Sequence, residues 1–305
     1  MKMTRQVAAA TPVLLAALLL ASASAASLSS QLGLAAPRRR LDLLRGGEAD
    51  EDEPSSLDAA ENRGLTRAEI AAKLSEIPAF CVTNEKGDVA MFRIKGDKGF
   101  KAAVLFFLEP DEAKAAMEAL QQAMPDTKLK LTLHGLGAAF EHCLGWQQIK
   151  TSPMAAGVVD QADAAFFASS DPEPAKTPAG ETVEMRIVGN HALVNTTKED
   201  MVSLLAQNSI EAGAWTLPVF LCNQLQSKSV FPAFLKPSDL RKTWMAAGRK
   251  EEDIPEDIVV VDLRLLVAQM LTDANDWGRY HLVPSDEAVA FAAELQGAPP
   301  ADADA

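Results

Sequence analysis

Histidines and carboxylates are the first side chains to consider for catalysis or metal binding. The chain has four widely separated histidines, His134, His142, His191 and His281. None lies in an H-E-x-x-H sequence or beside a cysteine at the spacing of metal ligands. Scattered carboxylates such as Asp262, Asp273 and Asp276 have no fixed spacing that would suit a general acid and base. We therefore predict no metal-binding residue and no carboxylate-based catalytic residue.

The three cysteines are the candidates for nucleophilic or redox chemistry. Cys81 and Cys222 each follow a Pro-x-Phe sequence, as in folds where a proline precedes a strand beside a redox site. Dithiol exchange needs a second, resolving thiol, but neither these residues nor Cys143 belongs to a C-x-x-C pair. The glycine-rich and nucleophile-elbow motifs of cofactor and hydrolase sites are also absent. We predict no catalytic residue, no cofactor and no enzyme activity; the alternative is a thioredoxin-like or other lumenal enzyme without a recognisable active-site motif.

Charge and composition exclude further classes of protein. Among 305 residues, 29 are basic and 42 acidic, which gives a net charge of −13. Such a chain is poorly suited to binding a phosphate backbone, so nucleic acid is not an expected partner. The apolar content of 48% is high enough for a folded core.

The charge is unevenly distributed, and the N-terminal segment has the pattern of a targeting sequence. Residues 1–25 combine a basic start, a short apolar run and small residues, which predicts a signal peptide. Residues 26–45 are rich in Ser, Leu, Ala and Arg and resemble an organelle transit peptide. An uncleaved signal anchor and a secreted protein with a basic propeptide remain open alternatives. Beyond residue 45 the chain has 23 basic and 41 acidic residues, a balance of −18.

The remaining segments predict two related folded halves. We expect an acidic linker at 46–63, a first half at 64–150, a loop at 151–181, a second half at 182–296 and a disordered tail at 297–305. The sequence Ile-Pro-Ala-Phe ending at Phe80 is matched by Leu-Pro-Val-Phe ending at Phe220. Phe-Leu-Glu-Pro-Asp before residue 112 is matched by Phe-Leu-Lys-Pro-Ser-Asp before residue 240. We predict an α/β (α+β) fold with an internal pseudo-two-fold repeat.

Local patterns predict the elements of each half. Capping-box sequences at Thr66 and at Thr196–Glu199 predict that a helix opens each half. A hairpin is expected to join strands 78–82 and 89–94, and Gly96 to Gly99 reads as a second hairpin turn. Further strands are expected at 104–108, 129–133 and 258–261. Three prolines follow strands and precede acids, which places them in the first turns of helices: Pro110, Pro237 and Pro284.

Two helices are expected to carry matching apolar stripes. The stripe residues are Leu136, Ala139, Phe140, Cys143 and Leu144 in the first half, and Leu263, Leu266, Val267, Met270 and Leu271 in the second. Because both stripes are apolar, we expect them to border a seam between the halves. A client segment with basic and apolar residues is expected to lie in this seam, attracted by the acidic surface.

A series of motifs in the folded span resembles a known family. The run Ile77–Gly87, the strand Val104–Phe107 and the following Asp-Glu-Ala resemble its first half. Its second half is resembled by the segments 185–188, 217–220, 231–240 and 258–271, followed by Asp276-Trp277 and Val283-Pro284. The order of these motifs is similar to that of the twenty-two-kilodalton Tic family, the soluble intermembrane-space component of the chloroplast inner-envelope translocon. The resemblance covers about residues 70 to 285, leaving the segment 151–180 and the tail unmatched.

The resemblance implies a protein-import factor that binds unfolded clients in a chaperone-like way. Its implied partners are plastid preproteins and envelope translocon components, with no integral membrane span in the mature chain and with peripheral membrane association as a further option. The implied location is the plastid intermembrane space, or the equivalent space of a secondary plastid, reached through the two-part presequence. The sequence does not name client-binding residues, and an interaction scaffold without holdase activity is the third interpretation.

Overall fold

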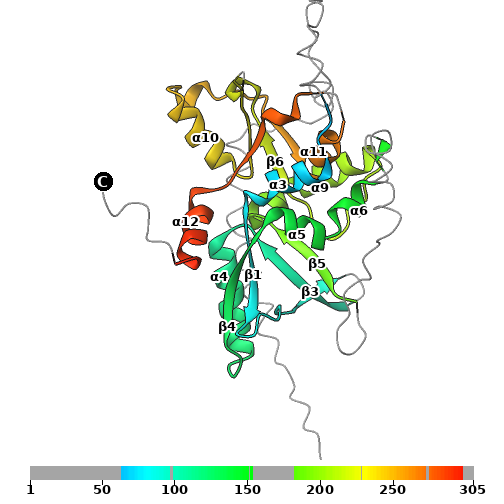
Figure 1. Ribbon diagram of the computed structural model, residues 1–305, viewed down its shortest axis with the longest axis vertical. Coiled ribbons are helices and arrows are strands. Elements are labelled where there is room, and N and C mark those ends of the chain that lie inside the picture. The colour runs from blue at the N-terminus through cyan, green and yellow to red at the C-terminus, as the bar shows by residue number, and fades with distance from the viewer. Residues whose placement is uncertain are drawn as a thin grey trace, which may run out of the picture.

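The computed structural model describes residues 63–96, 99–150, 152–153, 182–227, 229–272 and 275–297 (Figure 1). The predicted signal peptide and transit-like segment lie outside these residues, as do nearly all of the linker, the inter-half loop and the tail. The helices are α3 (Arg67–Ser75), α4 (Pro110–Ala123), α5 (Leu136–His142), α6 (Gly145–Ile149), α9 (His191–Gln207), α10 (Pro237–Ala246), α11 (Leu263–Met270) and α12 (Asp286–Leu295). The strands are β1 (Pro78–Asn84), β2 (Phe92–Gly96), β3 (Gly99–Phe107), β4 (Leu129–Gly135), β5 (Glu184–Val188), β6 (Pro218–Leu221), β7 (Phe231–Phe234), β8 (Val259–Asp262) and β9 (Tyr280–Val283). These elements form a mixed α/β fold, as predicted.

The strands form two sheets in which four strands have the same order and directions. In the first sheet β4, β1 and β3 are antiparallel neighbours and β5 pairs with β3 in parallel; in the second, β8, β6, β7 and β9 follow the same scheme. The registers also correspond, since Phe80 lies opposite Phe107 and Phe220 lies opposite Phe234. β2 is an addition to the first sheet, where it pairs with β3. The matched strand orders agree with two related halves, while a two-fold axis between them stays a prediction.

One strand lies in a different sheet from the one that the predicted boundaries imply. β5 falls within the predicted second half, 182–296, but its five residues pair with β3 of the first sheet, from Ala103 opposite Glu184 to Phe107 opposite Val188. The boundary at residue 181 therefore separates β5 from its own sheet. Parallel strands are joined by a long connection, so residues that pair between β3 and β5 are far apart in the sequence. Local sequence patterns therefore could not predict this pairing.

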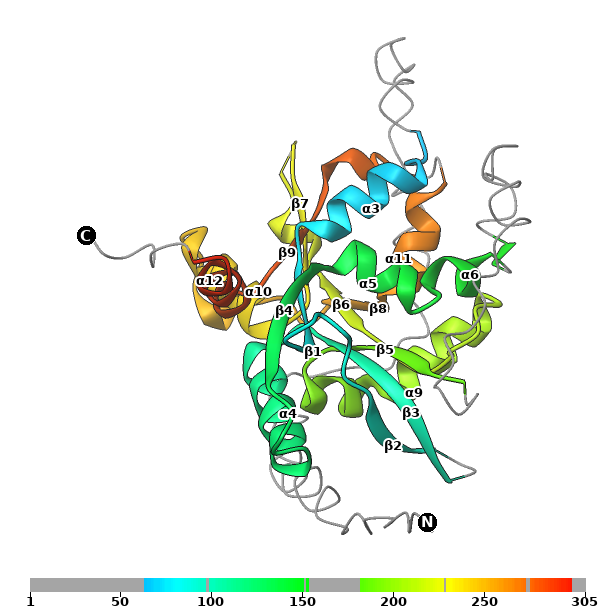
Figure 2. The same ribbon diagram turned by 60° about the horizontal axis from the view of Figure 1, so that its bottom comes forward.

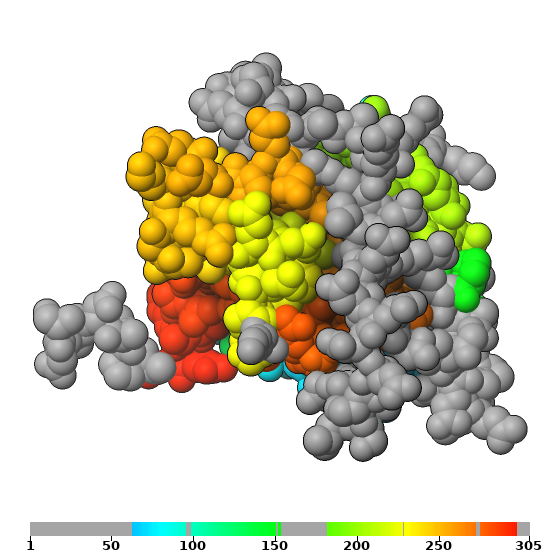
Figure 3. All heavy atoms as spheres, turned by 90° about the horizontal axis from the view of Figure 1, so that it is seen from above, coloured from blue at the N-terminus to red at the C-terminus, as the bar shows by residue number. Residues whose placement is uncertain are grey.

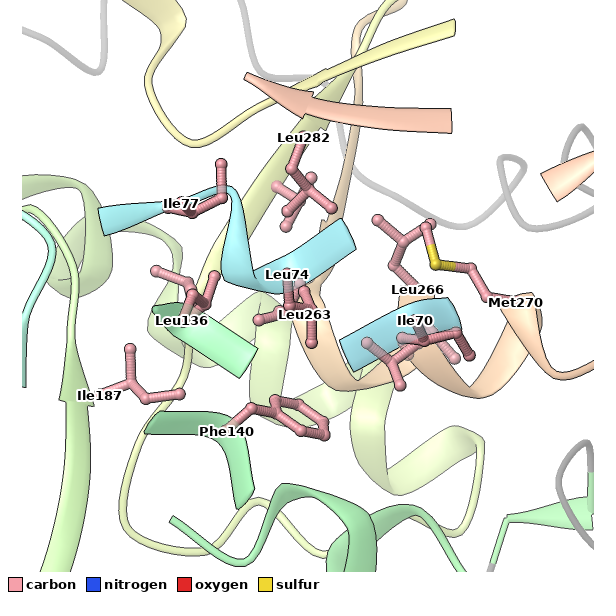
Figure 4. Packing of buried hydrophobic residues seen from close by; sticks show 14 of the residues in the cluster. Ile70, Leu74, Ile77, Leu136, Phe140, Ile187, Leu263, Leu266, Met270 and Leu282 are labelled. Carbon is pink, nitrogen blue, oxygen red and sulfur yellow. The ribbon is translucent and has the colours of Figure 1, made fainter. Parts of the chain in front are cut away.

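The main core lies between the two sheets and is shared by both. Side chains alternate along each strand, so that Cys81 of β1 faces this core while its neighbour Phe80 faces the outer side of the first sheet. Helices α3, α5 and α11 contribute buried residues to the shared core, and Figure 4 shows side chains of all three helices together with Ile187 of β5 and Leu282 of β9. Gly137 permits the close approach of α5 to α3, because a Cβ atom there would lie 2.5 Å from the carbonyl oxygen of Ala71.

Each sheet is covered on its outer side by a helix that follows the last strand of the other sheet. Helix α9 follows β5 of the first sheet and packs against β6 and β8 of the second. Helix α12 follows β9 of the second sheet and packs against β1, β4 and α4 of the first. In Figure 1, the red helix α12 accordingly lies beside α4. This exchange of helices joins the two sheets into one body.

Several local predictions are confirmed. The Thr66 hydroxyl accepts from the Glu69 amide and the Glu69 carboxylate accepts from the Thr66 amide, which is the predicted capping box of α3. Helices α4 and α10 begin at Pro110 and Pro237, as expected. Gly96 pairs with Gly99 at the tip of the β2–β3 hairpin.

Three local predictions are wrong. Helix α9 begins at His191 behind an Asn190 cap, so the Thr196–Glu199 pattern lies inside the helix, where Thr197 donates to the carbonyl of Leu193. The predicted hairpin between strands 78–82 and 89–94 does not form as a paired ladder, because β2 pairs with β3. An isolated bridge between Thr83 and Val89 links the segment before β2 to β1. Pro284 precedes the Ser285 cap of α12 and is not in the helix.

Because both sheets share one core, we predict that a core substitution destabilises them together. Leu266 of α11 is fully buried in the shared core. Leu266→Ala removes part of this packing and should lower the free energy of unfolding by about 2 to 5 kcal/mol. We expect a lower urea midpoint with one coincident transition in tryptophan fluorescence and far-ultraviolet circular dichroism. Two separate transitions would contradict a shared core.

Candidate functional site

The three cysteines are buried and have the wrong electrostatic surroundings for a reactive thiol. Burial raises the pKa of Cys81 to about 12, and it also raises the pKa values of Cys143 and Cys222. Reactive cysteines instead have lowered pKa values and are partly exposed. Cys81 faces the shared core whereas Cys222 packs against α10, so the two thiols after matching Pro-x-Phe sequences do not meet. The structure thus gives no support to the alternative of a redox enzyme.

Two of the four histidines contact the same phenylalanine ring, His142 stacked on it and His134 at a right angle to it. The Phe106 ring centroid is 5.7 Å from that of His134 and 5.9 Å from that of His142. Burial and the nearby His142 lower the pKa of His134. His191 contacts Asn195 within α9, and His281 is exposed on β9. The described residues contain no group of three or more His, Cys, Asp or Glu side chains placed to hold a metal ion.

The scattered carboxylates have structural partners where the structure describes them. Asp276 forms an ion pair with Arg279 at 3.9 Å, and Asp273 lies outside the described residues. Asp262 is fully buried, caps α11 through the Arg264 amide, and accepts from the Leu217 amide at 3.1 Å. Asp262 and Asp276, the two carboxylates that the structure describes, thus have separate structural partners.

The most enclosed charged group is the ion pair between Asp262 and Arg264. The Nε atom of Arg264 lies 2.9 Å from the Asp262 carboxylate, and both side chains are fully buried. The guanidinium also donates to the carbonyl oxygens of Glu211, Ala212 and Trp215 and to the side chain of Gln148. A buried charge is tolerated when its hydrogen-bonding capacity is used in this way. The pair therefore fixes the segment before β6 against α6 and α11.

The predicted seam for a client is closed among the described residues. Leu136, Ala139 and Phe140 are fully buried, as are their counterparts Leu263, Leu266 and Val267. Leu144 is the exception: it has a left-handed φ of 59° and is exposed. Because the two stripes form the shared core, the prediction that a client lies between them is wrong.

A cluster of charged residues where α4, α10 and α12 begin was missed by the sequence reasoning. Glu109 and Lys236 are the residues before the matched prolines, and their side chains form an ion pair with only 12% and 13% exposure. Lys236 also binds Glu287 of α12 at 2.9 Å. Burial raises the pKa of Glu109; burial alone would lower the pKa of Lys236, but Glu109 and Glu287 together raise it. This ion pair forms only when the two helix starts pack together. The one signal in the sequence is that Glu109 and Lys236 occupy the same position before the two matched prolines.

Among the residues that the structure describes, the most exposed large apolar side chain lies on the β2–β3 hairpin. Phe100 is 63% exposed and lies opposite Lys95, on the face that Arg93 shares by strand alternation. Val89 and Met91, on the segment leading into β2, are also exposed. Figure 2 shows this hairpin extending away from the labelled helices. We call these five residues the hairpin patch; it combines apolar and basic side chains on a chain with a net charge of −13.

The chain is thus a two-sheet α/β protein with an enclosed core and an apolar, basic hairpin patch.

No family model and no curated protein matches the chain. It is similar in structure to Tic22 of Anabaena, named as a protein-transport protein, with 19% identity over 77% of this chain and 98% of that chain and a TM-score of 0.44. It is also similar to Tic22 from Plasmodium falciparum, with 16% identity over 74% and 97% of the two chains and a TM-score of 0.45. Both names are those of the family that the sequence motifs resemble.

Removing Lys236 provides a test of the charged cluster. In Lys236→Met, the Glu109 carboxylate stays buried without its cation. We therefore predict that the free energy of unfolding falls by about 3 kcal/mol at pH 8. A carboxyl group whose pKa is raised on folding destabilises the native state above its unfolded pKa, so the loss should shrink as pH falls toward 5.

Urea unfolding at the two pH values measures this effect. The double variant Glu109→Gln with Lys236→Met has no group at position 109 that titrates, and it should lack the additional pH dependence. A loss for Lys236→Met that is equal at pH 5 and pH 8 would contradict the assignment.

Proposed function

We propose that this protein is a plastid protein-import factor that assists translocation of preproteins across the envelope by binding their unfolded segments. The observation that carries the proposal is the ordered series of family-like motifs, which correspond to matched structural positions. Pro78 and Pro218 begin the central strands β1 and β6, and Pro110 and Pro237 begin the helices after β3 and β7. Protein transport is also the function given in the name of the similar Anabaena protein.

The proposed location is the plastid intermembrane space or the corresponding space of a secondary plastid. The signal-peptide pattern at 1–25, followed by the transit-like segment at 26–45, supports this route. The proposed partners are preproteins in transit and components of the envelope translocon. Among the described helices, none is long and apolar enough to cross a membrane.

We propose the hairpin patch as the first contact for clients. An exposed phenylalanine can gain free energy by covering apolar side chains of an unfolded segment, whereas the apolar stripes are already covered in the core. Arg93 and Lys95 favour segments that carry acids beside their apolar residues. The expected attraction of a basic presequence to an acidic surface therefore does not apply at this patch. Contact with so small a surface is weak and reversible, as release of a translocating client requires.

Suppression of client aggregation tests this role. We predict that the wild-type chain slows the aggregation of an unfolded model client, and that Phe100→Ser reduces the effect. Met245→Ser is the matched control, because Met245 is an exposed apolar residue on α10, outside the patch. The assay is run with and without a few hundred millimolar salt to separate apolar from charge contacts. A wild-type chain that suppresses aggregation under neither condition would refute chaperone-like binding, and equal effects of the two variants would refute the patch.

A further inference from the structure

One acceptor motif for a covalent modification has no part in the function proposed above. The sequence Asn195-Thr196-Thr197 fits the pattern Asn-x-Ser/Thr, which receives N-linked oligosaccharides on secretory chains. In all 305 residues it is the one place where an asparagine has Ser or Thr two positions later. The signal peptide predicted at 1–25 would bring the chain to the membrane at which this modification takes place. Whether the position can carry a bulky group is a question for the structure.

The acceptor side chain lies on the outer face of α9. Asn195 is exposed, and its Nδ2 atom lies 3.2 Å from Nε2 of His191, one turn earlier in the same helix. The buried residues of α9 are Thr197, Met201, Leu204 and Leu205. Helical periodicity places these four on one stripe and Asn195 on the opposite side. Figure 3 shows the yellow-green α9 at the right-hand edge of the molecule. A group attached to Asn195 would therefore extend into solvent and displace no core residue.

The hydroxyl residue of the motif is accessible only before α9 packs. In the folded protein Thr197 is 5% exposed, and its hydroxyl donates to the carbonyl oxygen of Leu193 at 2.8 Å. Helices in proteins owe most of their stability to packing, and α9 packs on β6 and β8 of the second sheet. A chain that has not yet formed this sheet therefore presents Asn195 and Thr197 together, whereas the folded protein presents Asn195 alone.

We propose that Asn195 carries an N-linked oligosaccharide, attached as the chain enters the endoplasmic reticulum and before α9 packs. The donor is an oligosaccharide joined to a lipid through pyrophosphate. The amide nitrogen of Asn195 forms a bond to C1 of the first sugar, and the bond between C1 and the pyrophosphate oxygen breaks. The lipid pyrophosphate leaves with the bonding electron pair, and the amide gives up one proton to the base of the transferring enzyme. This inference goes beyond the proposed import function and rests on the predicted secretory route.

The attached sugars would change one surface of the second sheet. Val202 is 37% exposed and follows Asn195 by two helical turns, so both side chains lie on the same face of α9. Sugars at position 195 cover this apolar side chain and keep other proteins from packing on this face. The hairpin patch belongs to the first sheet, so the modification leaves the proposed client contact open.

Translation of the full-length chain in a cell-free system with endoplasmic-reticulum microsomes tests the site. We expect one protease-protected form of lower gel mobility, which returns to the mobility of the unmodified chain after N-glycosidase treatment. Asn195→Gln and Thr197→Val should lack this form. Thr196→Ala is the matched control, because it changes the neighbouring hydroxyl residue and keeps the motif, so it should be modified like the wild type. Transfer precedes folding in this proposal, so the result does not depend on whether a variant folds.

A second measurement tests the order of transfer and folding. A synthetic peptide of residues 190–202 should accept the oligosaccharide from detergent-solubilised microsomes, whereas the purified folded protein should not, because Thr197 is buried there. Equal modification of peptide and folded protein would contradict the proposed order. In protein isolated from its own cells, N-glycosidase should convert the amide at position 195 to a carboxylate, which mass spectrometry detects.

Two results of the microsome experiment would overturn the site. One is a wild-type chain that enters the microsomes, as protease protection shows, and keeps its mobility. The other is a chain that does not enter, which would remove the predicted secretory route as well. An amide that carries no sugar in protein from the cells would also overturn it. None of these outcomes bears on client binding, which the aggregation assay decides separately.

Discussion

The buried ion pair between Asp262 and Arg264 is the constraint on which the arrangement of the two sheets depends. Asp262 ends β8, caps α11 and holds the start of β6, while Arg264 binds the carbonyl groups of the preceding segment and Gln148 of the first half. Removing one partner of such a pair costs about 3 to 5 kcal/mol, because the remaining charge stays buried. The matching position in the first sheet is Gly135, so this pair belongs to the second sheet alone.

With the sheets fixed in this way, the apolar interior serves packing, and the proposed client contact is confined to the surface. The two apolar stripes are buried in the shared core. What remains available is the hairpin patch around Phe100. This patch belongs to the first sheet, to which β2 is an addition that the second sheet lacks among the described residues. Duplicated strands therefore coexist with different surfaces.

The sequence predicted those features that depend on neighbouring residues and missed those that depend on packing. The capping box at Thr66 and the helix starts at Pro110 and Pro237 follow from local hydrogen bonding and a fixed φ. The similar pattern at Thr196 failed because hydroxyl groups inside a helix can bond to carbonyl groups four residues earlier. The sheet to which β5 belongs, the exchange of α9 and α12, and the pairing of Glu109 with Lys236 arise only when distant segments pack. The hairpin patch was missed because exposure of Phe100 is a tertiary property.

Site-specific photo-crosslinking during import tests whether the chain contacts preproteins in transit through its surface. A photoreactive amino acid is placed at position 100, and in a second protein at position 245 on α10, in organelles that import a labelled preprotein. We predict a covalent adduct between the chain and the arriving preprotein from position 100, and much less from position 245. Absence of an adduct at position 100 during active import, or equal yields at the two positions, would contradict it.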